Sequence, residues 1–324
     1  MQIGLFRESG GLGDVVMMGG AVRRLKAEGH EVYFIGFGEY RDVVDHMGYD
    51  GMYELLSAVR NRRRKRLDVM RVNDKDYFQC VKWLGYDRIY DMFCPGYNHE
   101  AVAVSDGGSI TVNRVEAFQL ACGFTHDFVA PKWEVSEEEL KMAQRWLDVQ
   151  QIKNEKGIVL HIRATDIARS YKYFKLLCIK LKEKGYQPIL MDSVESYEHD
   201  KFVTYIWKEP LWLKASIIKL TNKFIGVDSG FFHIAAAIGA RTYSLWGPTD
   251  GEQTSKLYRN NINIVTDDYF DSKHECHPML EGIEIVCKPP CIHAPVACRS
   301  KLGCKYLNNL TADKILAVME GKQC

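Results

Sequence analysis

The chain has 324 residues, 46% of them hydrophobic and 26% charged, which are the proportions of an ordinary globular protein. At roughly 100–200 residues per domain, this length predicts about two domains and excludes a chain that is largely disordered. The 43 Lys and Arg residues balance 42 Asp and Glu residues, so the net charge of +1 produces no global attraction to nucleic acid or membrane.

Membrane and secretory segments are not expected either. The longest near-apolar stretch, 231–240, is about half of the ~20 residues that a membrane helix needs. Charged Arg7, Glu8 and Asp14 interrupt the first apolar segment, which is unlike a secretory leader. We therefore expect a cytoplasmic protein without a transmembrane segment, for which peripheral membrane contact stays open.

The first half of the chain alternates strands and helices. A strand at 2–6 precedes a glycine-rich turn at 10–14, and apolar residues at helical spacing predict a helix at 15–28 that Gly29 ends. An apolar strand at 32–37 completes a parallel β-α-β unit. Further elements are a strand at 89–93 and a helix at 140–149.

The same alternation returns after the polar segment 153–157. It predicts an α/β fold with two Rossmann-like domains, 1–153 and 154–324, whose mostly parallel sheets face a cleft. Such sheets bind ligands beyond the carboxyl ends of their strands. The predicted elements of the second domain are strands at 158–162, 187–191, 224–227 and 242–246, and helices at 172–184, ending at 222 and beginning at 232.

Glycines Gly10, Gly11 and Gly13 surround the first strand-to-helix turn, which ends in Asp14. Glycine lets the backbone approach a ligand closely, and the helix start offers unpaired N–H groups. The alternative is a tight turn in which Asp14 is simply a favourable acid in the first turn. The segment lacks the Gly-Lys-Ser/Thr ending of a P-loop and the spacing of a dinucleotide-binding turn.

A second strand-to-helix turn, 224–233, places Asp228, Ser229 and Gly230 before a helix with small side chains. The amides of this turn are suited to an anion, and His233 lies in the first turn of the helix. Alternatively, Asp228 or Ser229 is a helix cap and His233 a core histidine. A third turn follows the next strand at Gly247, Pro248 and Thr249.

Together these segments resemble glycosyltransferase family nine, which includes the heptosyltransferases of lipopolysaccharide synthesis. The matching residues are 13–16 with 21–26, 226–230 with 233–239, and 245–250, with weaker matches at 86–91, at 113–116 and at Cys291, Cys298 and Cys304.

The resemblance implies a GT-B fold with the acceptor in the first domain and a nucleotide diphosphate sugar in the second. It also implies inverting transfer with no cofactor and no catalytic metal. Asp14 matches the family's base, which removes a proton from the acceptor hydroxyl. We expect the Ser229 and Gly230 amides and His233 at the diphosphate, Asp228 at the sugar hydroxyls, and Gly247, Pro248 and Thr249 beside them.

One segment departs from the family pattern. Where the family usually has His-Pro-Gly-Ala and then a Lys-Arg-Trp run, this chain has His161-Ile162-Arg163-Ala164 and then Arg169-Ser170-Tyr171. Arg163 and Arg169 are candidates for binding the donor phosphates, because arginine binds phosphate bidentately. The alternative is that both are solvated surface charges. The sequence specifies neither the nucleotide base nor the sugar.

A basic run and a cysteine cluster remain. The run could contact an anionic glycan or glycolipid acceptor, or nucleic acid, or be a solvated face. Because of the run, we keep sugar transfer to modified DNA bases and a non-catalytic nucleic-acid-binding protein as alternatives. A sugar-nucleotide epimerase that uses the same scaffold is a further alternative. The cysteines could bind a structural zinc, form disulfides or remain free thiols. The run comprises Arg60, Arg62, Arg63, Arg64, Lys65 and Arg66, and the cluster Cys287, Cys291, Cys298 and Cys304.

Overall fold

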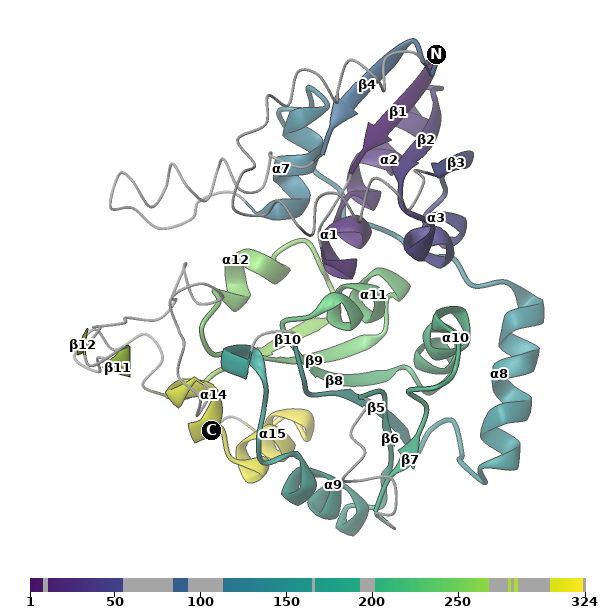
Figure 1. Ribbon diagram of the computed structural model, residues 1–324. Coiled ribbons are helices and arrows are strands. Elements are labelled where there is room, and N and C mark those ends of the chain that lie inside the picture. The colour runs from purple at the N-terminus through teal and green to yellow at the C-terminus, as the bar shows by residue number, and fades with distance from the viewer. Residues whose placement is uncertain are drawn as a thin grey trace. The chain divides into compact units, whose positions relative to one another are not determined.

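The computed structural model divides into two compact units, 1–134 and 135–324, each with a parallel sheet of its own (Figure 1). The unit boundary precedes helix α8 (Glu137–Val149), whereas the predicted domain boundary at 153 follows it, because α8 packs on α10 (Leu211–Thr221) of the second unit. The structure describes residues 1–7, 11–54, 84–92, 113–164, 167–192, 202–267, 279–280, 283–284 and 304–322.

The sheet of the first unit has four parallel strands in the order β3-β2-β1-β4. The chain therefore starts near the middle of the sheet, moves outward on one side and then returns to β4 on the other. A ligand site is expected beyond the carboxyl ends of β1 and β4, where this direction changes. The strands are β1 (Gln2–Phe6), β2 (Glu31–Gly36), β3 (Gly51–Glu54) and β4 (Arg88–Asp91), and the helices α1 (Leu12–Met17), α2 (Gly19–Ala27), α3 (Arg41–His46) and α7 (Arg114–Ala121), with a short 3-10 turn at Gly38–Tyr40.

The helix predicted at 15–28 is divided at Met18 into α1 and α2. Gly19 and Gly20 follow the break, and glycine is a weak helix former. Gly20 also lets α2 lie close to α7 and the segment after it, because a Cβ there would be 2.7 Å from both Gln119 Nε2 and Val129 O. The predicted end at Gly29 is confirmed, with φ of 82°.

The second unit has a six-stranded parallel sheet in the order β10-β9-β8-β5-β6-β7. The chain enters at β5, builds β6 and β7 on one side, and then crosses to β8 on the other. The change of direction therefore lies between β5 and β8. The strands are β5 (Gly157–His161), β6 (Gln187–Leu190), β7 (Thr204–Tyr205), β8 (Lys223–Val227), β9 (Arg241–Leu245) and β10 (Asn261–Ile264), with a two-stranded antiparallel pair β11 (Met279–Leu280) and β12 (Ile283–Glu284).

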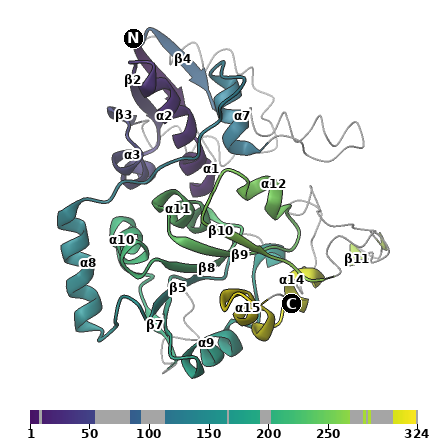
Figure 2. The same cartoon turned by 180° about the vertical axis from the view of Figure 1, so that it is seen from behind.

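Helices cover both faces of this sheet (Figure 1 and Figure 2). Helices α10 and α11 (Gly230–Ile238) pack on the central strands on one face, while α9 (Phe174–Glu183) and α15 (Ala312–Met319) contact each other on the opposite face. Because both faces are buried, only the strand ends offer polar groups to a ligand. The shorter helices are α12 (Gly251–Ser255), α14 (Lys305–Asn309) and a 3-10 turn at Ile167–Arg169. Among the described residues, no helix has the length and apolar character needed to cross a membrane.

Candidate functional site

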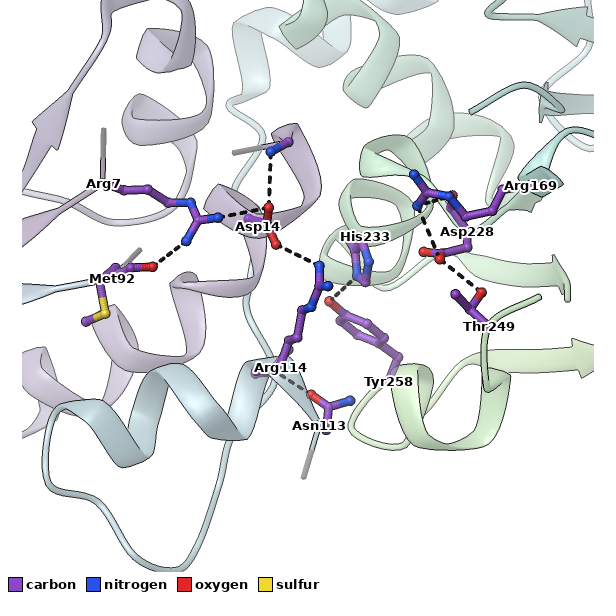
Figure 3. A network of polar contacts seen from close by, with 12 residues as sticks. Arg7, Asp14, Met92, Asn113, Arg114, Arg169, Asp228, His233, Thr249 and Tyr258 are labelled. Carbon is purple, nitrogen blue, oxygen red and sulfur yellow. Dashed lines mark hydrogen bonds and ion pairs between the residues drawn. The ribbon is translucent and has the colours of Figure 1, made fainter. Parts of the chain in front are cut away.

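Asp14 lies in the first turn of α1, just beyond the carboxyl end of β1. Its side chain is 9% exposed. Oδ2 accepts a hydrogen bond of 3.1 Å from the Gly11 amide and forms an ion pair of 2.9 Å with Arg7 Nη2. Oδ1 forms an ion pair of 3.1 Å with Arg114 Nη1 (Figure 3). The two guanidinium groups therefore hold the carboxylate in a single orientation.

Arg7 is the more deeply buried of the two arginines, with a side chain that is 1% exposed. It donates a hydrogen bond to the Met92 carbonyl beyond β4, and its guanidinium lies 5.6 Å from the centre of the Phe118 ring. Arg7 was not predicted as a site residue; in the sequence it stood out only as a charge that interrupts an apolar segment. The sequence did contain an indication that Arg7 belongs to the site, because this charged residue stands at the end of an apolar strand and seven residues before Asp14.

Arg114 approaches Asp14 from α7. Asn113 caps this helix by accepting from the Val115 amide, and the Asn113 amide donates a hydrogen bond of 3.1 Å to Glu116 Oε2. The side chain of Arg114 is 35% exposed. Arg114, the cation next to Asp14 Oδ1, is thus more accessible to solvent than Arg7, the buried cation next to Oδ2.

In the second unit, Asp228 follows β8 and connects two other predicted site residues. Its Oδ2 accepts a hydrogen bond of 3.0 Å from the Thr249 hydroxyl and pairs with Arg169 Nη1 at 3.3 Å (Figure 3). Arg169 Nη1 also lies 3.3 Å from the Asp228 carbonyl. The structure therefore brings together the turns after β8 and β9 and the 3-10 turn that ends at Arg169. Arg163, by contrast, is an exposed residue.

Ser229 is the N-cap of α11 and accepts from the Phe232 amide at 3.5 Å. Its Oγ also lies 2.9 Å from Nδ1 of His161, the last residue of β5. Nε2 of His161 lies 3.5 Å from Oδ1 of buried Asp192, which follows β6. Neither His161 nor Asp192 was predicted as a site residue: His161 stands in the segment that departs from the family pattern, and Asp192 belongs to none of the motifs.

Three other predicted donor residues lie in or beside the core. His233 is 3% exposed, and its Nδ1 is 3.0 Å from the hydroxyl of buried Tyr258 (Figure 3). Gly247 and Pro248 are both buried. A Cβ on Gly247 would lie 2.7 Å from the Leu307 Cβ, so α14 packs directly on this turn. Gly230, in contrast, begins α11 and is partly exposed.

The remaining predicted residues are only partly described. Gly11 is the N-cap of α1 and Gly13 is buried within it. Cys304 is a buried residue at the start of α14. In the described part of the chain, no three His, Cys, Asp or Glu side chains gather as a metal site would require. Gly10, the basic run Arg60–Arg66 and the cysteines Cys287, Cys291 and Cys298 lie outside the described residues.

Comparison with known proteins decides the family. A model of glycosyltransferase family 9 (heptosyltransferase) matches residues 85–279, more than half of the chain. The chain belongs to this family. The expected resemblance is confirmed, and the protein is a glycosyltransferase. A search of the curated proteins finds no match.

Solved structures confirm the GT-B fold. Escherichia coli ADP-heptose lipopolysaccharide heptosyltransferase II has 16% identity and a TM-score of 0.66, over 99% of this chain and 98% of that one. E. coli heptosyltransferase WaaC with ADP has 14% identity and a TM-score of 0.59, over 99% of both chains. The iron-containing dodecameric glycosyltransferase TibC of enterotoxigenic E. coli has 13% identity and a TM-score of 0.60, over 99% of this chain and 75% of that one.

Proposed function

We propose that this glycosyltransferase transfers a sugar from a nucleoside diphosphate sugar to a hydroxyl group of an anionic glycan or glycolipid, with inversion and without a catalytic metal. The observation that carries the proposal is Asp14, a nearly buried carboxylate held at the carboxyl end of β1 by Arg7, Arg114 and the Gly11 amide. A fixed carboxylate is the group that an inverting transfer requires as its base.

In the proposed step, Asp14 Oδ1 accepts the proton of the acceptor hydroxyl while the hydroxyl oxygen forms a bond to the anomeric carbon. The bond from that carbon to the diphosphate breaks, and the diphosphate leaves with the electron pair. Oδ1 is the suitable oxygen because its partner Arg114 is partly exposed, whereas Oδ2 is occupied by Arg7 and by the Gly11 amide.

The donor is proposed to bind at the carboxyl ends of β5, β8 and β9. The amides of Ser229 and Gly230 at the start of α11 suit a diphosphate, and Arg169 adds a cation. Asp228, oriented by Arg169 and Thr249, is suited to accept from sugar hydroxyls. Because related structures contain ADP or ADP-heptose, an ADP-linked sugar is the first donor to test.

His233 is proposed to act indirectly at this site. Its ring is buried against Tyr258, so it supports the first turns of α11 from within the unit. The nucleic-acid alternatives depend on Arg60–Arg66, and no feature within the described ranges favours them.

Replacing Asp14 tests the proposal. We expect Asp14→Asn to lower the rate of sugar transfer from ADP-heptose to a lipopolysaccharide core acceptor by about 100- to 10,000-fold, the usual contribution of a general base. ADP affinity, measured by calorimetry, should stay unchanged. Asp45→Asn, at an exposed position in α3, is the matched control. Full turnover by Asp14→Asn contradicts the assignment of the base, and loss of activity with a chelator contradicts metal independence.

A further inference from the structure

Three polar side chains line the carboxyl ends of three neighbouring strands. Since β5 lies between β6 and β8, the residues that follow these strands meet at one edge of the sheet. His161 lies between Asp192 and Ser229 there: its Nδ1 is hydrogen-bonded to Ser229 Oγ at 2.9 Å, and its Nε2 lies 3.5 Å from Asp192 Oδ1, which is a charge contact. A bond of 3.5 Å connects the Phe232 amide of α11 to Ser229 Oγ.

Asp192 is held beside His161 by two backbone amides. Its Oδ2 accepts from the Ile162 amide at 2.8 Å and its Oδ1 from the Arg163 amide at 3.1 Å. Burial raises the pKa of Asp192, whereas the neighbouring His161 and the two amides lower it. The Asp192 oxygen that faces Nε2 of His161 favours the tautomer with its hydrogen on Nε2. Burial lowers the pKa of His161, and the ring is therefore neutral at pH 7.

In a neutral ring protonated at Nε2, Nδ1 is an acceptor. The Ser229 hydroxyl must then donate to Nδ1, which directs an oxygen lone pair to the Phe232 amide. Both hydrogen bonds then run one way, from the amide of α11 to serine and from serine to histidine, and Nε2 of histidine lies next to Asp192. Hydrogen bonds in such a chain strengthen one another.

We propose that Asp192 and His161 are positioning residues, which orient the Ser229 hydroxyl and so hold the first turn of α11 in the conformation that receives a diphosphate. This inference rests on the proposed donor site. It also assigns a role to the Ser229 hydroxyl. The hydrogen of this hydroxyl is directed to His161, and the phosphate oxygens are bound by backbone amides.

The packing around His161 agrees with a positioning role. The ring is 12% exposed and lies 4.7 Å from the Phe231 ring, which itself lies in the first turn of α11. Lys214 of α10 also lies next to Phe231, with Nζ 5.7 Å from the centre of its ring. Its positive charge further disfavours a protonated His161. Removing the ring would therefore free both Ser229 and Phe231.

The first test measures the tautomer of His161 by ¹⁵N NMR of histidine-labelled protein, with His161→Gln used to assign its resonances. We expect hydrogen at Nε2 and a free lone pair at Nδ1. In Asp192→Asn, the share of the Nδ1-protonated form should rise. A wild-type ring protonated at Nδ1 overturns the proposal, and this test does not depend on any ligand.

The second test measures ADP affinity by calorimetry. Ser229→Ala, His161→Leu and Asp192→Asn should each weaken binding by about 2- to 10-fold, the value of one neutral hydrogen bond. His161→Leu combined with Ser229→Ala should bind about as well as either alone, because both remove the same chain. His161→Gln, which retains one donor and one acceptor, should recover part of the loss.

Ser216→Ala is the matched control, since Ser216 is buried in the same unit and its hydroxyl donates only within α10, to the Trp212 carbonyl at 2.8 Å. It should leave ADP affinity unchanged. Variants that bind ADP as tightly as the wild type, or losses that add fully in the double variant, overturn the positioning role. A wild type with the expected tautomer that binds no nucleoside diphosphate overturns the proposed donor site instead.

Discussion

Replacing Arg7 by methionine is the sharpest test of how the first unit holds Asp14. The substitution retains much of the apolar volume and removes a guanidinium that is 1% exposed and lies 2.9 Å from the carboxylate. Breaking a buried ion pair costs ~3–5 kcal/mol because a charge stays buried without its partner. Arg114 and the Gly11 amide still contact Asp14, so we expect the lower end, about 3 kcal/mol.

The assay is calorimetric melting of the variants in one buffer. At roughly 3–4 °C per kcal/mol for a unit of this size, Arg7→Met should lower the Tm by about 10 °C. The control is Arg41→Met, because Arg41 pairs with Glu54 at 3.4 Å with both side chains about half exposed. That pair should contribute less than about 1 kcal/mol.

A double variant isolates the charge effect. Arg7→Met combined with Asp14→Asn leaves no buried carboxylate without its partner, and it should be more stable than Arg7→Met alone. If Arg7→Met and Arg41→Met lower the Tm equally, or if the double variant is the least stable of all, the buried ion pair does not hold this unit together as argued.

Two further predictions concern the pH dependence of folding and the packing of α2. Burial lowers the pKa of His161 in the folded state, so the unfolded chain takes up its proton first as the pH falls. The stabilising effect of a neutral His161 is therefore complete above the usual histidine pKa of 6.5 and is lost as the pH falls below it. The fall in Tm between pH 7 and pH 5.5 should be smaller in His161→Gln than in the wild type. An equal fall in both proteins contradicts the argument. Gly20→Ala should lower the free energy of unfolding in urea by about 1–3 kcal/mol, because a Cβ would lie 2.7 Å from the Val129 carbonyl oxygen. An unchanged midpoint of urea unfolding would show that α2 and α7 can separate without cost.

The local elements could be predicted from the sequence because their causes lie within a few residues. The alternation of apolar strands and amphipathic helices predicted the α/β class, and Gly29 and Gly185 end helices with φ of 82° and 81°. The turns after β1, β8 and β9 were found for the same reason: glycines and polar residues interrupt apolar runs there. Asp14 and Asp228 are candidates on these local grounds.

The partners of these residues could not be predicted, because they are far away in the sequence. Arg114 lies 100 residues after Asp14, and Met92 lies 85 residues after Arg7. Asp192 and Ser229 meet at His161 only because β6 and β8 flank β5 in the sheet.

The sequence by itself thus determined the class of the fold, the strand-to-helix turns and the residues that they carry. Only the tertiary structure decided that Asp14 is held between two arginines and that Ser229 is connected to Asp192 through His161. The physical reason is the range of the interactions: helix starts and turns depend on neighbouring residues, whereas the order of strands depends on burying both faces of a sheet along the whole chain.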